Sequence, residues 1–328
     1  DVCSSDLGLR PTASNAQDVT CPPMASPVVE GSPEPMSGKK IGVSVAYLSV
    51  PFYANFKTGL EDGAKRFGFD YDLRDGGGGD LSVEVGNIQD FIAQKYDLIL
   101  LTPSGEGIIP GIVEANNAGI PVIEVNNRAG YDSGKADVVT YVGADDVEYG
   151  RQQARLVNQL FGDNPAKIGY VMGISGTSPQ INRAQGFNEI LATFPQYEIV
   201  ATVNDDFDSA KALAATQDLL TRFPKGELDA IVMQGPEGVA AAQFAQQNGR
   251  EEIKFVLGDY DAGVRQAIID GSVAGTVNQD PYPQAFEAMH MAWLYLNGRE
   301  SEIPKPFYQP LPIVTAENAE TVPPSWGC

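Results

Sequence analysis

Short apolar runs and amphipathic helical stretches alternate along the chain, and the same order of elements occurs twice. The first copy covers residues 41–126: IGVSVAYL, the helical stretch FKTGLEDGAKRFG, a strand ending near Leu73, a further helix, then YDLILLTP and IPVIEVN. The second copy covers residues 168–259: IGYVMG, a helix through Asn188–Phe194, YEIVATVNDD, another helix, then LDAIVMQGP and IKFVLGD. Strands that alternate with helices in this way are typical of βαβ units.

The spacing between the copies is nearly constant, which supports a true structural repeat. Ile41 and Ile168 are 127 residues apart, and Asp97 and Asp229 are 132 apart. Because βαβ units are right-handed and build parallel sheets, we expect an α/β protein with two Rossmann-like lobes. Ligands of open α/β sheets bind at the carboxyl ends of the strands, so the cleft between the lobes is the expected site.

The length and charge of the chain narrow the function classes. With 328 residues the chain has room for two domains that each have a core. Its net charge of −21 disfavours nucleic acid as a partner, because an acidic surface repels a phosphate backbone. We find no run of 18 apolar residues, so the sequence predicts no membrane-spanning helix.

The first 38 residues differ from the rest, because they are rich in Pro and Ser and lack any period, as in a flexible leader. No signal-peptide stretch is present, so we expect that export is absent or that the signal peptide has been removed. Residues 1–7 (DVCSSDL) resemble a translated sequencing adapter, which would make Cys3 an artefact. Cys21 and Cys328 then remain, and either a disulfide in an oxidising compartment or two unpaired thiols fits them.

Most of the residue patterns that enzymes use for catalysis are absent from the sequence. The single histidine, His290, falls in the helical run AFEAMHMAWLYLNG, so nucleophilic catalysis with a histidine base is disfavoured. No metal-binding spacing occurs, and the GGGG at residues 76–79 lacks the completion of a dinucleotide fingerprint. We therefore predict no catalytic residue, no metal and no cofactor.

Aromatic and polar residues gather where the predicted strands end. Phe52 and Tyr53 follow the first strand, and Phe207 follows the matching part of the second copy. Aromatic faces stack on the C–H faces of sugar rings, and Asn, Asp and Arg side chains suit a polyhydroxylated ligand. Each such residue taken singly is more often a turn or cap residue, but their common location favours a site. The polar candidates are Asn126, Asn127, Arg128, Asp259, Asp261 and Gln279.

From Lys40 to about Thr315 the chain resembles the periplasmic sugar-binding proteins of ABC importers, the ribose-binding branch of the type I fold. The resemblance rests on the segments IGVSVAYLSVPFY, TPSGEGIIPGIVEANNAGIPVIEVNNR, GISGTSPQINRAQGF, NDDFDSAKAL, LGDYD, IIDGSVAGTVNQDP and MAWLYLNGR. It implies a sugar held between the rings of Phe52, Tyr53 and Phe207. It also implies a polar role for Gln279 and for either Asp259 or Asp261.

The polar set departs from the ribose-binding pattern. Where those proteins have Asp-Arg, this chain has Asn126-Asn127-Arg128, so Arg128 keeps the arginine only if one residue is inserted. Their second-lobe arginine falls on Ile181, with Asn182 and Arg183 next along the chain. We therefore expect a sugar or polyol other than ribose as the ligand.

The resemblance also implies three hinge strands, near 144–145, 280 and 310, so that each lobe is discontinuous in sequence. The expected first lobe consists of residues 39–143 and 281–309, after the leader. The expected second lobe consists of residues 144–280 and 310–328.

The leading functional prediction is a non-enzymatic, extracytoplasmic (periplasmic) solute receptor. It would act as a monomer that delivers a sugar or polyol to an ABC-type permease, with a chemoreceptor as a further partner. The alternatives are the effector-binding core of a lac-repressor-type regulator and a small-molecule enzyme. The regulator would need a helix-turn-helix before the core, and residues 1–38 have too many prolines and too few basic residues for one. The missing histidines count against the enzyme.

Overall fold

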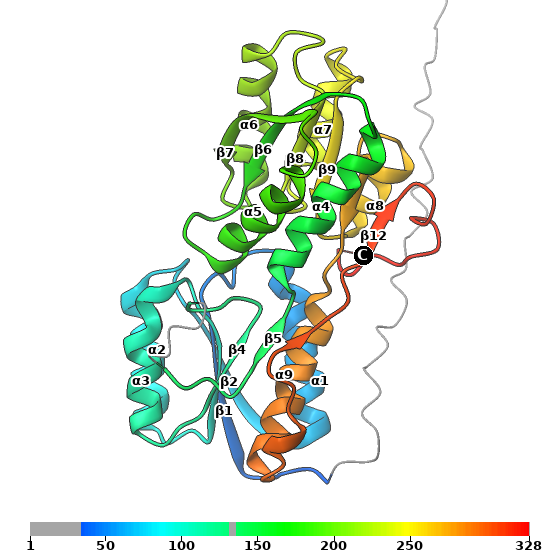
Figure 1. Cartoon of the computed structure of the whole chain (residues 1–328). Helices are drawn as coiled ribbons and strands as arrows, with labels where there is room; N and C mark the ends of the chain where they lie inside the picture. The colour runs from blue at the N-terminus through cyan, green and yellow to red at the C-terminus, as the bar shows by residue number, and fades with distance from the viewer. Residues whose placement is uncertain (1–33, 131–135, 328) are drawn as a thin grey trace, which may run out of the picture.

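The protein folds into two α/β lobes, shown one above the other in Figure 1. This computed structural model describes residues 34–130 and 136–327. Each lobe has a six-stranded sheet with helices on both faces. None of the described helices is long and apolar enough to span a membrane.

The sheet of the first lobe has the strand order β11-β5-β4-β3-β1-β2, and all of its neighbouring strands are parallel. Its strands are β1 (Lys39–Val45), β2 (Phe69–Asp75), β3 (Leu98–Thr102), β4 (Val122–Val125), β5 (Tyr141–Gly143) and β11 (Phe307–Tyr308). Helices α1 and α9 pack together on one face, and α2 and α3 cover the other (Figure 1). The helices are α1 (Phe52–Phe67), α2 (Leu81–Ala93), α3 (Ile109–Asn117) and α9 (Pro281–Leu296), with short 3-10 turns at Glu106–Ile108 and Glu300–Glu302.

The sheet of the second lobe repeats this arrangement with the order β12-β10-β9-β8-β6-β7. Its strands are β6 (Ala166–Met172), β7 (Tyr197–Asn204), β8 (Ala230–Met233), β9 (Lys254–Gly258), β10 (Gly275–Val277) and β12 (Ile313–Thr315). Only the edge strand β12 is antiparallel to its neighbour among the described strands. The helices are α4 (Asp146–Phe161), α5 (Ser178–Leu191), α6 (Ser209–Arg222), α7 (Val239–Gln247) and α8 (Ala262–Ile269).

The chain passes between the sheets three times. The first passage lies between β5 and α4, the second between β10 and α9, and the third between β11 and β12. These passages lie where the sequence predicted hinge strands. The predicted fold class, two Rossmann-like lobes with parallel sheets joined by three crossings, is therefore confirmed. The division of the chain into a leader and two lobes at the residues given above remains a prediction, and residues 1–33 of the expected leader lie outside the described part.

Several helices begin directly after an aspartate residue beside the cleft between the lobes. Aspartate precedes each of these helices and accepts a hydrogen bond from a backbone N–H of the first turn, as an N-cap does. Ends that are capped in this way fix the loops that follow the strands. The capping residues are Asp80, Asp145, Asp208, Asp261 and Asp280.

Element boundaries differ from the sequence expectation by a few residues. The first strand ends at Val45 and α1 begins at Phe52, so the two aromatic residues belong to the helix. The helix expected through residues 188–194 ends at Leu191. The predicted pairing of Cys21 with Cys328 lies outside the described residues.

Candidate functional site

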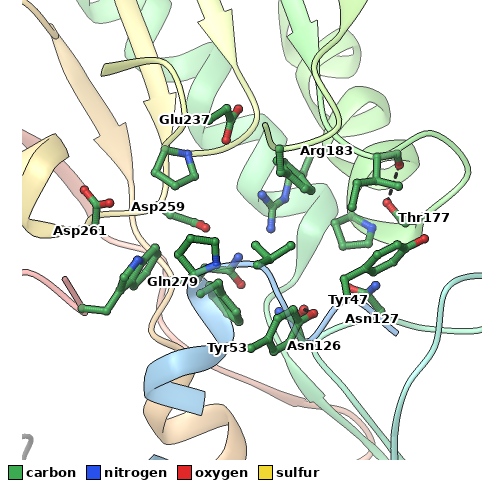
Figure 2. A pocket seen from close by; sticks show the side chains of 18 of the residues that line it. Tyr47, Tyr53, Asn126, Asn127, Thr177, Arg183, Glu237, Asp259, Asp261 and Gln279 are labelled. Carbon is green, nitrogen blue, oxygen red and sulfur yellow. Dashed lines mark hydrogen bonds between the residues drawn. The ribbon is translucent and has the colours of Figure 1, made fainter. Parts of the chain in front are cut away.

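A cavity of about 160 Å³ lies between the lobes, at the carboxyl ends of both sheets (Figure 2). This is the place that the strand topology predicted. Both lobes supply lining residues, among them Phe52 and Asn126 from the first and Phe207 and Asp259 from the second. A ligand held there would contact both lobes at once.

Nine of the eleven predicted site residues line this cavity. They are Phe52, Tyr53, Asn126, Asn127, Arg183, Phe207, Asp259, Asp261 and Gln279. Arg128 and Asn182 instead line a neighbouring hollow between the lobes. Their part in ligand binding stays a prediction, although the geometry favours Arg183 over Asn182.

A chain of amide and phenol groups organises the first-lobe side of the cavity. The hydroxyl of Tyr53, on α1, donates to Asn126 Oδ1 at 2.9 Å. The amide of Asn126 donates in turn to Gln284 on α9 at 3.0 Å, and Gln284 donates to Gln279 at 3.0 Å. Burial raises the pKa of the Tyr53 phenol, so it stays a neutral donor. This side of the cavity is thus polar but uncharged.

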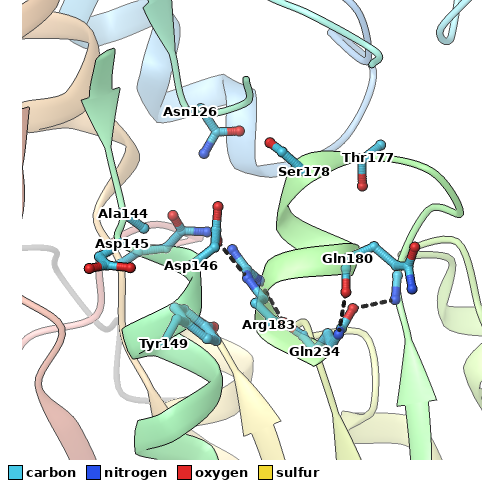
Figure 3. A network of polar contacts seen from close by, with 12 residues as sticks. Asn126, Ala144, Asp145, Asp146, Tyr149, Thr177, Ser178, Gln180, Arg183 and Gln234 are labelled. Atoms are coloured by element: carbon cyan, nitrogen blue, oxygen red, sulfur yellow. Dashed lines mark hydrogen bonds and ion pairs between the residues drawn. The ribbon is translucent and has the colours of Figure 1, made fainter. Parts of the chain in front are cut away.

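A buried ion pair organises the second-lobe side, as Figure 3 shows. Arg183, on α5, donates from Nε to Asp146 Oδ1 of α4 at 2.9 Å and from a terminal nitrogen to the Gln234 carbonyl at 2.7 Å. Its guanidinium also lies 3.9 Å from the ring centre of Tyr149. Such a charge tolerates burial because its partners replace the lost water.

Asp259 is one of three acids that line the cavity from this side, with Glu237 and Asp261. Its Oδ1 accepts a 2.9 Å hydrogen bond from the Tyr149 hydroxyl, while its own backbone N–H donates to that hydroxyl. Burial raises the pKa of Asp259 to about 6, and the nearby Arg183 charge and the Tyr149 hydrogen bond hold it from rising further. Asp261, in contrast, caps α8 by accepting from the Val264 N–H at 2.7 Å.

Three residues that line the cavity have a left-handed backbone. Asn126, Phe207 and Asp259 have φ values of 63°, 57° and 60°. Asn and Asp adopt this conformation readily, whereas a phenylalanine there is strained by roughly 1–3 kcal/mol. The ring of Phe207 lies close to Gly173 and Gly235, where a Cβ would meet the ring at 2.1 and 2.7 Å. Those two glycines leave the space for the ring.

Arg128 lies at the edge of the cleft. Its guanidinium donates to the Tyr308 hydroxyl at 2.9 Å and lies 4.1 Å from the ring centre of Tyr141. Its backbone N–H donates to Ser178 Oγ at 2.8 Å, which joins the first lobe to α5 of the second. The turn at Asn126 is what places Arg128 here, because its positive φ redirects the chain directly after β4.

The sequence analysis missed several lining residues, of which Trp326 is the largest. Its ring packs edge-to-face on Phe52 with centres 5.4 Å apart. The tail that carries it is held from both lobes, since the Ser325 carbonyl accepts from Asn55 and the Ser325 N–H donates to the Tyr260 carbonyl. No periodic pattern marks this tail, so only its aromatic residue could have drawn attention. Tyr47, Thr177 and Glu237 also line the cavity.

Comparison with known proteins agrees with this fold. Residues 41–300 match a family model described as a periplasmic binding protein domain. A ribose import binding protein of Haemophilus influenzae is 30% identical over 74% of this chain and 80% of its own length. A xylitol-binding protein of Mycolicibacterium smegmatis is 25% identical over 86% and 78%. The solved arabinose-binding component of an ABC transporter from Shewanella is 26% identical, with a TM-score of 0.77 over 86% of this chain and 93% of that one.

Proposed function

The chain belongs to the periplasmic binding protein family, and from this premise we propose that it is an extracytoplasmic receptor for a sugar or polyol. It captures this ligand between its lobes and delivers it to an ABC-type permease, without catalysing a reaction. The names of the relatives support this ligand class, since they bind ribose, xylitol and arabinose.

The observation that carries the proposal is the composition of the cavity. Phe52 enters from the first lobe and Phe207 from the second, so an aromatic residue from each lobe can contact a ring-shaped ligand. Asn127, Asp259 and Gln279 supply amide and carboxyl groups at the strand ends, which are the groups that pair with hydroxyls. A hydroxyl buried without such a partner would cost about 1–3 kcal/mol, so partners on both sides are required.

A thermal-shift screen against pentoses, hexoses and polyols tests the ligand class. A ligand that binds only the folded protein raises its apparent stability, by about 2.7 kcal/mol at a hundred times Kd. Gln279→Ala should weaken the binding of any sugar or polyol that raises the melting temperature. Failure of every such compound to raise it would contradict the proposal.

Tryptophan fluorescence tests the location of the site. Trp326 lines the cavity, whereas Trp293 lies on α9 against Phe67, away from it. We expect a ligand to change the emission of the wild-type protein and of Trp293→Phe, but not that of Trp326→Phe. A ligand that stabilises the protein without this difference would bind elsewhere.

Delivery to a permease needs a cellular measurement. Deleting the gene should abolish uptake of the labelled ligand at low concentration, and a plasmid copy should restore it. A copy with Gln279→Ala should restore uptake only at higher ligand concentration, because its receptor binds more weakly. Unchanged uptake after deletion would contradict a delivery role.

A further inference from the structure

Acidic side chains outnumber basic ones around the cavity. Glu237, Asp259 and Asp261 line it, and Arg183 is the one cationic residue among the described residues that do so. Arg183 is already balanced by Asp146, with which it forms an ion pair whose side chains are only 3% and 5% exposed. A ligand that enters the cavity therefore meets an excess of carboxyl groups.

Glu237 is a lining carboxyl group that forms no ion pair with a cation of the described residues and lies against a second acid, Asp205. Figure 2 shows it on the second-lobe side of the cavity, where the loop after β8 carries it. The residue is 7% exposed, both of its carboxyl oxygens are buried, and the side-chain group within hydrogen-bonding reach of them is the carboxyl group of Asp205. Buried polar groups in folded proteins are almost always paired, and two carboxyl groups that have mainly each other are short of N–H or O–H donors.

A second buried acid, Asp205, makes the position of Glu237 more costly. The carboxyl groups of Asp205 and Glu237 lie within hydrogen-bonding reach of each other, and Asp205 Oδ2 also receives no bond from a described donor. Burial is the main cause that raises the pKa of Glu237 well above its ordinary value, and the charge of Asp205 is the second cause. When one proton is shared between the pair, the remaining Glu237 oxygen is still only an acceptor.

Several lining donors of both lobes are partly used within the protein. An amide N–H of Asn126, an amide N–H of Asn127 and the hydroxyl of Thr177 each donate to a carbonyl oxygen of the protein itself. The acceptors of the cavity therefore include the carboxyl groups of Asp259 and Glu237, and Arg183 is the one lining cation among the described residues. A ligand that matches the cavity must bring N–H or O–H donors and, to balance the acids, positive charge.

We propose that the site recognises an amino sugar or amino polyol, a polyhydroxylated ligand whose protonated amine is held by Glu237. This specificity rests on the proposed function and narrows it. Asp259 and Gln279 bind the hydroxyl groups of the same ligand, while the rings of Phe52 and Phe207 contact its carbon skeleton.

An ammonium group fits the vacant acceptors better than a hydroxyl does. It supplies three N–H donors and one positive charge, whereas a hydroxyl supplies one donor and no charge. Hydrogen bonds between two ionised groups are about twice as strong as those between neutral groups. The ammonium also takes the place of the proton shared by Glu237 and Asp205, which is released to the solvent, and its positive charge then offsets the charge of the two carboxylates.

Matched ligand pairs test the proposal on the full chain by calorimetry, in buffer with about 150 mM salt and a chelator to exclude metal ions. Each pair contains a neutral compound and its amino-deoxy analogue: glucose with glucosamine, galactose with galactosamine, sorbitol with 1-amino-1-deoxysorbitol, and inositol with aminodeoxyinositol. We expect the amine of at least one pair to bind about tenfold to a hundredfold more tightly than its neutral partner. The N-acetylated amines, which carry no charge, should lose this advantage.

Glu237→Gln assigns the effect to one residue. It keeps the shape of the side chain and should reduce the ratio of amine to neutral affinity to near one. It should also make the free protein more stable, because its amide can donate to Asp205 without the uptake of a proton. Glu124→Gln is the matched control, because Glu124 is equally buried but does not line this cavity, and it should leave the ratio unchanged.

The possible outcomes separate this proposal from the proposed function. Neutral compounds that bind as tightly as their amines in every pair would overturn the amine specificity and leave a sugar or polyol receptor. An amine preference that survives Glu237→Gln would overturn the role of Glu237. Absence of binding by every member of every pair would overturn both proposals.

Discussion

The two lobes present equivalent strand ends to the cavity but differ in their charge. Asn126 follows β4 and Asp259 follows β9, strands that hold the same position in the two sheets. Both residues have a left-handed backbone, and both accept a 2.9 Å hydrogen bond from a tyrosine hydroxyl, Tyr53 and Tyr149 respectively. One side chain is a neutral amide and the other is an acid.

This difference shows how a repeated fold acquires an asymmetric site. The backbone of each copy brings a side chain to the same place, because the strand order and the turn after the strand are the same. The residue identity then sets the electrostatics. The first lobe holds its side of the cavity with neutral hydrogen bonds, whereas the second buries charges that need partners.

The largest loss of stability should come from removing Arg183, the cation on the second-lobe side of the cavity. Arg183→Met leaves Asp146 and Asp259 buried without a positive neighbour, which costs about 3–5 kcal/mol of unfolding free energy. Urea denaturation at pH 7 measures this loss. Arg151→Met is a matched control, because Arg151 on α4 pairs with Glu189 on α5 across the same two helices but is about one-third exposed.

Exposed pairs contribute about 0–1 kcal/mol, so the control variant should stay near wild type. Equal losses of unfolding free energy in Arg183→Met and Arg151→Met would show that the buried ion pair stabilises the second lobe no more than an exposed pair does. The comparison between the lobes would then rest on hydrogen bonding alone.

The next largest effect concerns Asp259 and the dependence of folding stability on pH. Asp259 has a folded-state pKa of about 6 against an ordinary value of 3.8. Below pH 3.8 both the folded and the unfolded states hold the proton. Between 3.8 and 6 the unfolded state loses it first, so the stability contributed by this group falls as the pH rises through about 6.

Asp259→Asn removes this titration and makes the second strand end resemble the first. At pH 7 the variant should be more stable than wild type by up to about 3 kcal/mol, the equivalent of about two pKa units. Other buried acids, such as Asp280 with a pKa of about 6, titrate in the same range, so the informative quantity is the difference between the two pH profiles. A difference that does not change between pH 4 and 7 would contradict the prediction. Asn126→Gln is the first-lobe control and should leave the shape of the pH profile unchanged.

The sequence was sufficient for the fold because the fold depends on periodicity. The repeated order of strands and helices predicted both sheets, and turn residues predicted polar strand ends such as Asp259 and Gln279. The site was harder to predict because it depends on contacts between distant segments. Trp326 reaches the cavity through an irregular tail, and the pairing of Asp205 with Glu237 joins two loop residues that are 32 positions apart in the chain.

A smaller effect should separate the aromatic residues of the two lobes. Phe52 packs on Tyr53 and Trp326, whereas Phe207 lies strained in a loop and is only half-buried. Phe207→Ala should weaken ligand binding by about tenfold while changing stability little, since the ring is only half-buried and alanine keeps the same backbone strain. Phe52→Ala should reduce binding and also destabilise the protein by about 3 kcal/mol, because it leaves a gap beside two rings. Calorimetric binding and urea denaturation of both variants measure the two quantities, and equal destabilisation would contradict the distinction.

The smallest effect tests the contact that joins the lobes directly. Ser178 Oγ, at the start of α5, accepts the backbone N–H of Arg128 at 2.8 Å across the cleft. A neutral hydrogen bond contributes about 0.5–1.5 kcal/mol, so Ser178→Ala should weaken ligand binding by roughly twofold to tenfold if the contact holds the lobes together around the ligand. The loss should appear as faster dissociation in stopped-flow fluorescence, because separation of the lobes frees the ligand. Ser82→Ala is the control, since Ser82 donates to Asp80 within the first lobe and should leave dissociation unchanged. Equal dissociation rates for wild type and Ser178→Ala would mean that the two differently charged strand ends, and not this contact, keep the lobes together.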